Sequence, residues 1–180
     1  MCFRIYSMVV VLYNIRSVFN VGSIFRTTDG AGIEKIYLCG VTPTPLDKFG
    51  LVRSDFTKVS LGAEKSVEWE QKHSTVKLLD RLKKEGYLIL AVEQDPKSVP
   101  YYEIRLPRPS ISLRARNDGR EADKICLVMG SEVNGLPKSI LDKADKILEI
   151  PMKGKKESLN VAIAFGIVAY HLMYGYIKTN

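Results

Sequence analysis

The sequence predicts an α/β domain with a mainly parallel sheet flanked by helices. Two observations support this prediction: short apolar, β-branched runs recur along the chain, and helical patterns separate several of them. Strands that alternate with helices are typical of a parallel sheet covered on both faces. The 180 residues suit one domain, and the chain has no internal repeat and no Gly/Ser-rich linker. The runs expected to form strands are 8–13, 35–40, 87–93, 124–130 and 146–151.

The first expected helix follows the first strand. Asn20 is predicted as its N-cap, because apolar residues recur after it at helical spacing. These residues are Val21, Ile24, Phe25 and Thr28. Ser74 is expected to cap a second helix, which ends at Gly86. Pro137 suits the first turn of a short helix that runs to about Ala144.

A long apolar stretch runs from Leu159 to Ile177, nineteen residues without a full charge. By length alone it could span a bilayer. The polar residues Asn160 and His171 and the absence of a second such stretch favour a helix in a core or a dimer interface. The N-terminus has no long apolar segment with a cleavage site, so no signal peptide is expected.

Composition favours a soluble, basic protein. The formal net charge is +7 and the pI is about 9.3, which favours a polyanionic partner such as nucleic acid or an anionic membrane surface. Three cysteines lie far apart without metal-binding spacing, which is typical of reduced thiols in the cytoplasm. Neither of the two histidines lies near another ligand type, so no metal centre is expected.

The stretch 105–124 breaks the pattern of strands and helices. It holds six basic and three acidic residues, two prolines and few apolar residues. It reads as a solvated surface loop or as an arginine-bearing arm that binds phosphates, and both can be true. We therefore expect one domain over 1–180, with this stretch as an arginine-rich insertion.

Three polar stretches lead away from the carboxyl ends of predicted strands: 14–26, 127–137 and 150–166. Taken singly, each has an ordinary explanation: a helix cap at Asn20 or Ser158, a surface cation at Arg26, and a turn with a solvated Glu132. Together they suggest a binding site, because ligands of open parallel sheets bind outside the carboxyl ends of the strands. No phosphate-loop glycine pattern is present, so a nucleotide triphosphate or dinucleotide is not the expected ligand.

In order and spacing, these stretches resemble the three motifs of the SpoU/TrmH family of SPOUT RNA methyltransferases. The matching patterns are N-x-R-S-x-x-N-x-G-x-x-x-R (14–26), L-V-x-G-S-E-x-x-G-L (127–136) and I-P-M-x(5)-S-L-N-V-A (150–162). The resemblance covers nearly the whole chain, so we expect one SPOUT methyltransferase domain over 1–180 and no separate RNA-binding domain. It implies a C-terminal trefoil knot, a homodimer, and S-adenosylmethionine as the donor of a methyl group to a ribose 2′-hydroxyl of tRNA or rRNA.

The resemblance also assigns residues. Those implied to contact the cofactor are Val92, Gly130, Ile150, Met152 and Leu159. Those implied to act in catalysis are Arg26, Asn20 as its partner, and Glu132, Ser158 and Asn160 as polar support.

A guanidinium ordinarily has a pKa above about 12, so we expect Arg26 to hold a phosphate or to stabilise the developing alkoxide instead of acting as a base. Two alternatives stay open: a non-catalytic RNA-binding protein that retains the fold, and a nucleotide- or NAD-binding enzyme. A pure RNA binder would not need all five polar residues.

Overall fold

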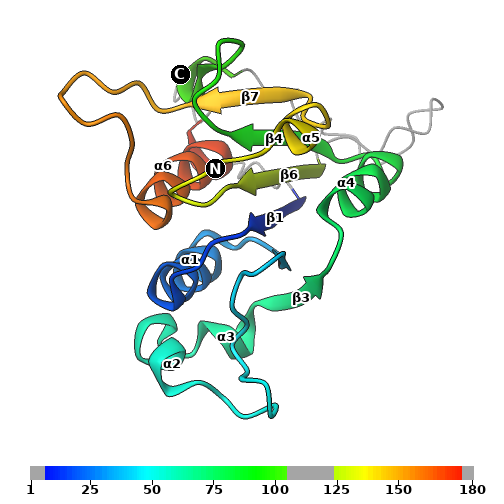
Figure 1. The fold of residues 1–180 in the computed structure, drawn as a ribbon, viewed down its shortest axis with the longest axis vertical. Helices are drawn as coiled ribbons and strands as arrows, with labels where there is room; N and C mark the ends of the chain where they lie inside the picture. Colours follow the sequence, from blue (N-terminus) through cyan, green and yellow to red (C-terminus); the bar gives the residue numbers. More distant parts are fainter. Residues whose placement is uncertain (1–6, 105–123, 176–180) are drawn as a thin grey trace.

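The computed structural model describes residues 7–104 and 124–175 and contains a seven-stranded sheet (Figure 1). The strand order is β3-β2-β1-β6-β4-β7-β5, and every pairing between these strands is parallel. The predicted parallel α/β architecture is therefore confirmed. The strands are β1 (Ser7–Tyr13), β2 (Lys35–Cys39), β3 (Glu68–Lys72), β4 (Leu88–Val92), β5 (Val99–Pro100), β6 (Lys124–Met129) and β7 (Lys146–Glu149).

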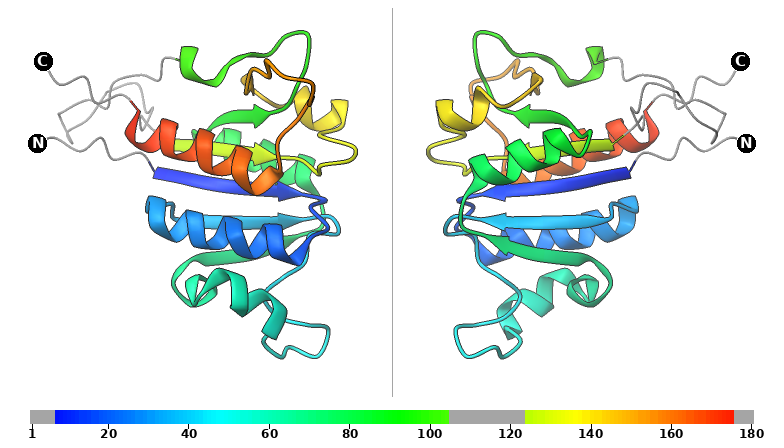
Figure 2. Two further views of the ribbon diagram at one scale, coloured as in Figure 1. Left: turned by 90° about the vertical axis from the view of Figure 1, so that its left-hand side faces the viewer. Right: turned by 90° about the vertical axis from the view of Figure 1, so that its right-hand side faces the viewer.

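Helices cover both faces of the sheet. The helices are α1 (Val18–Ala31), α2 (Ser54–Ser60), α3 (Ala63–Ser66), α4 (Thr75–Lys84), α5 (Lys138–Leu141) and α6 (Val161–Tyr174), with a 3-10 turn at Tyr101–Glu103. Figure 2 shows α1 and α6 side by side on one face, and α4 and α5 on the other. Both α1 and α6 begin at the edge where the strands end, so their N-termini lie beside the loops that follow the strands.

The central strands are apolar on both sides, because each face of the sheet has its own core. Along β1, Val10 and Leu12 are buried under α1 and α6 together with Phe25 and Phe165. Their neighbours Val9 and Val11 are buried on the opposite face, among residues that include the leucines of α4. Alternation of side chains along a strand thus divides one apolar run between two cores.

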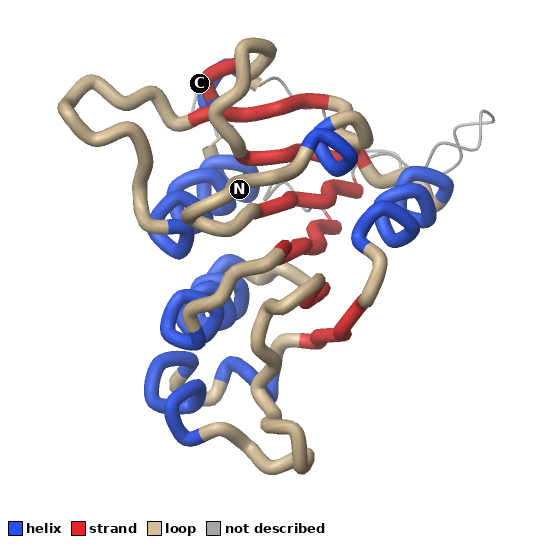
Figure 3. The backbone as a smooth tube through the Cα atoms, in the orientation of Figure 1, coloured by secondary structure: helices blue, strands red, loops and turns tan. Residues whose placement is uncertain are grey.

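The order of the strands is not the order of the chain. Strand β6 lies between β1 and β4, and β7 lies between β4 and β5. Strands from the C-terminal part of the sequence are thus inserted between strands that precede them in the chain. Figure 3 shows that residues 150–160 form a loop without helix or strand that joins β7 to α6. This arrangement is consistent with the expected trefoil knot.

The helix cap expected at Asn20 is wrong, and so is the cap that was the ordinary alternative explanation of Ser158. Ser17 caps α1, because its hydroxyl accepts a hydrogen bond from the backbone N–H of Asn20 at 3.3 Å. Asn20 therefore lies in the first turn, and its side chain is free to bind elsewhere. At α6 the cap is Asn160 and not Ser158, since the Asn160 carboxamide accepts from the N–H of Ala162 at 2.9 Å. The predicted cap at Ser74 is confirmed.

The ends of two other elements differ from the sequence expectation. Helix α5 ends at Leu141, earlier than Ala144, and Pro137 is its N-cap residue. The apolar stretch that begins at Leu159 contributes the 14-residue helix α6, and no helix in the described ranges is both long and apolar enough to cross a bilayer. The arginine-rich stretch lies, apart from Lys124, outside the described residues.

Candidate functional site

The three polar stretches meet at one edge of the sheet. The first and third begin directly after Tyr13 of β1 and Glu149 of β7, and the second includes the last three residues of β6 and the turn that follows Met129. One side chain from each stretch takes part in a single hydrogen-bonded chain. The Asn20 carboxamide donates through Nδ2 to Oε1 of Glu132, and the Asn160 Nδ2 donates to Oδ1 of Asn20 at 3.0 Å. Residues separated by as many as 140 positions in the sequence are thus in direct contact.

The direction of this chain is fixed at both ends. A carboxylate can only accept a hydrogen bond, so Glu132 requires the NH₂ group of Asn20. A backbone N–H can only donate, so the Ala162 amide requires the carbonyl oxygen of Asn160. The bond between the two asparagines satisfies both requirements at once. Each asparagine therefore uses its donor and its acceptor, which a carboxylate at either position would not reproduce.

Arg26 lies apart from this chain of hydrogen bonds. It is exposed on α1, six residues after Asn20, which corresponds to about 9 Å along the helix axis. Within the described part of the chain it makes no hydrogen bond or ion pair. Ser158 is also exposed and makes no hydrogen bond to another described residue. The structure thus brings Asn20, Glu132 and Asn160 together but leaves Arg26 and Ser158 outside the contact.

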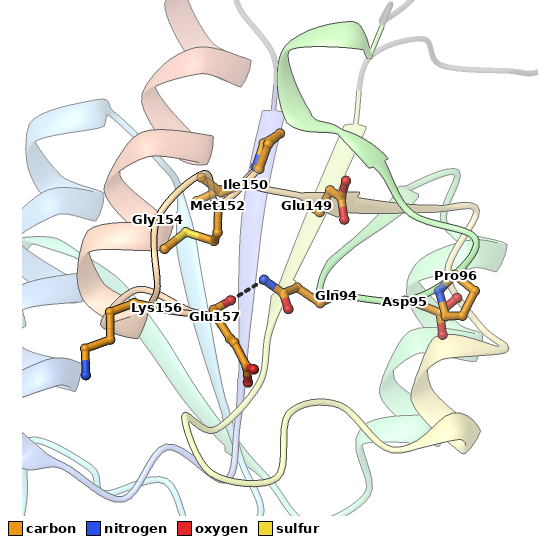
Figure 4. Close-up of a pocket in the computed structure, with 10 residues that line it drawn as sticks. Gln94, Asp95, Pro96, Glu149, Ile150, Met152, Gly154, Lys156 and Glu157 are labelled. Atoms are coloured by element: carbon orange, nitrogen blue, oxygen red, sulfur yellow. Dashed lines mark hydrogen bonds between the residues drawn. The ribbon is translucent and has the colours of Figure 1, made fainter.

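A cleft of about 580 Å³ lies beside the loop that joins β7 to α6 (Figure 4). Ile150 and Met152 line it and supply an apolar surface. Its acidic lining consists of Asp95, Glu149 and Glu157. Lys156 also belongs to the rim, but its side chain points away from the cleft in Figure 4. The cleft thus combines an apolar surface with carboxylates, a composition suited to a ligand with an apolar part and a positive charge.

The other three residues assigned to the cofactor lie near this cleft and not in its lining. Val92 ends β4, where it pairs with Met129 of β6 and Leu148 of β7. Gly130 follows β6 directly, and Leu159 is half-buried ahead of the α6 cap. A Cβ atom on Gly130 would lie 2.7 Å from the backbone carbon of Gly135. The turn after β6 therefore requires glycine at this position, whether or not a ligand is bound.

Sequence reasoning missed two residues that join the loops. Gln94 follows β4 and donates through Nε2 to the backbone carbonyl of Glu157, so it ties two walls of the cleft together (Figure 4). The Glu93 carboxylate accepts from the backbone N–H of Leu136 at 2.7 Å and from that of Gln94 at 3.0 Å. It lies against Gly135, which has a φ of 58°, and a Cβ atom at that position would clash with the Glu93 carboxylate. The sequence does contain a signal that could have identified Glu93, because it is an acidic residue directly after an apolar strand.

Comparison with known proteins gives one consistent family. The family model described as "SpoU rRNA Methylase family" matches residues 7–170. The chain is 28% identical over 163 residues to the tRNA (guanosine(18)-2'-O)-methyltransferase of Aquifex aeolicus, covering 91% of this chain and 67% of that protein. It is 27% identical to a TrmH-family protein of Staphylococcus haemolyticus, covering 92% of this chain and 58% of that protein.

Solved structures agree with the sequence comparison. A TrmH/SpoU tRNA modifying enzyme of Aquifex aeolicus matches with a TM-score of 0.74 and 27% identity, covering 94% of this chain and 75% of that one. An AdoMet-bound rRNA methyltransferase from Sinorhizobium meliloti matches with a TM-score of 0.78 and 24% identity, covering 98% of this chain and 60% of that one. The chain thus spans under two thirds of the length of several of the proteins that it resembles.

Proposed function

Because the chain belongs to the SpoU rRNA methylase family, we propose that it transfers a methyl group from S-adenosylmethionine to a ribose 2′-hydroxyl of tRNA or rRNA. The observation that carries the proposal is the hydrogen-bonded chain of Asn20, Glu132 and Asn160, which joins all three motifs at one edge of the sheet. The name of the Aquifex aeolicus relative, a tRNA 2'-O-methyltransferase, supports the choice of acceptor atom. A non-catalytic RNA-binding protein is the second candidate, but it has no need of this network.

The cleft suits S-adenosylmethionine in size and in chemistry. Ligand pockets commonly measure about 300–1,000 Å³, and this cleft measures about 580 Å³. Ile150 and Met152 would contact the apolar and aromatic part of the cofactor, and Asp95 and Glu149 would face its positive charges. Val92, Gly130 and Leu159 would contribute backbone groups from the adjoining loops. When bound, the cofactor supplies a methyl group on a positively charged sulfur.

The protein residues would act by alignment and electrostatics. The bonds from Asn20 to Glu132 and Asn160 hold the three loops in fixed relative positions, which orients the sugar hydroxyl in the site. Ser158, exposed next to Leu159, would support the pocket as a hydroxyl donor. Arg26 would hold the target phosphate or stabilise the negative charge that develops on the sugar oxygen, while phosphate or water removes the proton. An Arg26→Lys variant with full activity would show that the paired guanidinium donors are not needed.

We propose that the protein is a homodimer that buries the exposed face of α1 and α6. Phe19 on α1 and Ile163 and Tyr170 on α6 are 62%, 57% and 45% exposed. Phe19 and Arg26 are seven residues apart, so they lie on the same side of α1. A dimer through this face would bring Arg26 of one chain to the site of the other, which accounts for its isolation within one chain.

A mixing experiment tests this arrangement. Variants Arg26→Ala and Asn20→Ala should each be inactive. When the two are unfolded and refolded together, random pairing restores about a quarter of the sites if Arg26 serves the other chain. If the mixture stays inactive while it forms dimers, Arg26 acts within its own chain or not at all.

RNA would be held by basic segments around the site. Lys153, Lys155 and Lys156 are exposed on the loop before α6. We propose that residues 1–180 act as a single methyltransferase domain in which 105–124 adds an arginine-rich arm for phosphates. Deleting this arm should weaken RNA binding and leave S-adenosylmethionine binding unchanged.

The buried free thiols of Cys39 and Cys126 favour a reducing compartment, the cytoplasm.

The decisive assay incubates the protein with S-adenosylmethionine labelled in its methyl group and separated pools of tRNA and rRNA. We expect label in one pool and a 2′-O-methylated nucleotide when the product is mapped. The Asn20→Ala variant is the control and should lose the label. RNA binding without label in either pool would favour the non-catalytic alternative.

A further inference from the structure

A hairpin between β2 and α2 projects from the same edge of the sheet as the site (Figure 2). We call residues 44–53 the Phe49 hairpin. Leu46 and Val52 form an antiparallel bridge, and Asp47 and Leu51 are joined by a backbone bond of 2.8 Å. The Asp47 carboxylate also accepts from the N–H groups of Phe49 and Leu51, at 2.8 and 2.9 Å. These bonds hold the tip of the hairpin in one conformation.

This ordered tip presents apolar side chains to water. Phe49 is 74% exposed, Leu51 65% and Val52 59%. The ammonium of Lys48 lies 4.9 Å from the centre of the Phe49 ring. Exposed apolar side chains add little to folding stability, so a hairpin built to hold an aromatic ring in solvent points to a partner that covers it.

A groove of about 810 Å³ runs along the hairpin. Its lining includes Val41 and Leu51 as apolar residues, Lys48 and Arg53 as cations, and Gln71 from β3. The groove is also connected to the first motif. The backbone N–H of Val41 donates to the side-chain oxygen of Asn14 at 3.1 Å, and Asn14 is the first residue of that motif.

The charged residues of the groove lining are two cations, Lys48 and Arg53, and two carboxylates, Asp47 and Asp55. Asp47 is used by the backbone of the hairpin, and Asp55 pairs with Arg53 at 3.2 Å. Lys48 makes no ion pair with another described residue, so its charge is available to a ligand. A flat aromatic ring next to a cation without an ion pair among the described residues suits one class of partner in particular: bases of single-stranded RNA stack on aromatic side chains while cations contact their phosphates.

We propose that the Phe49 hairpin and its groove bind unpaired nucleotides next to the methylated one. A base stacks on Phe49, Lys48 meets the adjacent phosphate, and the neighbouring nucleotides follow the groove toward Asn14. This inference rests on the proposed function for the presence of RNA. It adds a surface outside the three motifs that selects RNA with an unpaired segment.

The test uses fluorescence. Phe49→Trp is made in a Trp69→Phe background, so that the only tryptophan is at the tip of the hairpin. A mixed-sequence, single-stranded RNA of about twelve nucleotides should quench its emission. An abasic oligonucleotide of the same length and charge should not, because it offers phosphates without bases.

Binding is then compared by titration of the same RNA into the wild type, Phe49→Ala and Tyr102→Ala. Tyr102 is the matched control, since it is 54% exposed but packs against Tyr101, which contacts His171 near the other end of α6. Loss of one stacked base is worth about 1–3 kcal/mol, so Phe49→Ala should bind about 5- to 150-fold more weakly. Tyr102→Ala should bind like the wild type.

Three results would overturn the inference: equal affinity in Phe49→Ala, equal quenching by the abasic strand, or a change from dimer to monomer in Phe49→Ala, which would make the hairpin a protein contact. Since the titrations need no methyl transfer, they are independent of the activity assay. If the protein is inactive but binds RNA through Phe49 in the titrations, only the proposed reaction is contradicted. If it is active but Phe49→Ala binds RNA as tightly as the wild type, only the proposed role of the hairpin is contradicted.

Discussion

Exchange of donor and acceptor between Asn20 and Glu132 gives a quantitative test of the site. Asn20→Asp preserves the size of the side chain but removes the NH₂ group that donates to Glu132. A hydrogen bond to a charged group contributes about 1.5–3 kcal/mol, and the exposure of Glu132 favours the lower end. Repulsion between two carboxylates accessible to water adds roughly 1 kcal/mol. We expect the free energy of unfolding to fall by about 2–3 kcal/mol.

The double variant Asn20→Asp with Glu132→Gln should restore stability to within about 0.5 kcal/mol, because glutamine donates where asparagine donated before. Aspartate still accepts from Asn160 through its second oxygen. Urea unfolding of the four proteins at pH 7 measures the coupling, and calorimetric titration of S-adenosylmethionine shows whether the loops keep their positions.

Asn134→Asp is the control for these variants. It adds the same charge in the turn that holds Glu132, at an exposed side chain that makes no hydrogen bond to another described residue. It should change stability by less than about 0.5 kcal/mol. The reasoning is refuted if Asn20→Asp is as stable as Asn134→Asp, or if the double variant is no more stable than Asn20→Asp alone.

Four other perturbations have defined outcomes. Asn160→Asp should keep the α6 cap and most of the stability but lose methyl transfer, whereas Asn160→Ala should also lose about 1 kcal/mol in thermal or urea unfolding. Glu93→Gln should lower the free energy of unfolding by about 1–2 kcal/mol in urea, since two backbone amides lose a charged acceptor. Ile163→Asp should convert a dimer to a folded monomer in light scattering; a persistent dimer would exclude the α1 and α6 face. Burial raises the pKa of the Cys39 thiol from 9.0 to about 11. Between pH 9 and 11 only the unfolded chain releases this proton, so the free energy of unfolding should fall as the pH rises through this range. Peptide mapping should also find Cys39 unmodified by thiol reagents at pH 8.

The parts of the fold that the sequence predicts are those buried on both sides. Apart from charged residues at their ends, the five expected strands are largely apolar, because helices cover both faces of the sheet. Strand β3 was missed because it is an edge strand of polar residues, held by pairing with β2 and by the 2.5 Å bond from Lys35 to Glu68. Helices α2 and α3 were missed because they are short and are separated by Leu61 and Gly62, both with positive φ.

The location of the site was predictable, but its contacts were not. Strand ends in a parallel sheet share one edge, so the meeting of the three polar stretches follows from the order of strands and helices. The bonds depend on one detail, the start of α1 at Ser17, which turns Asn20 from a cap into a cross-link. No periodicity distinguishes Ser17 from Asn20 as a cap, since both residue types cap helices well.

The contact between Asn20 and Asn160 also has a consequence for folding during synthesis on the ribosome. On the ribosome, β1 and α1 emerge long before Asn160 is added, and the pairing of β1 with β6 must wait for residues more than a hundred positions away. Contacts of such long range form slowly. A nascent chain therefore lacks the bond between Asn20 and Asn160 until α6 docks, so a chain released before that point would have three motifs that are not yet joined.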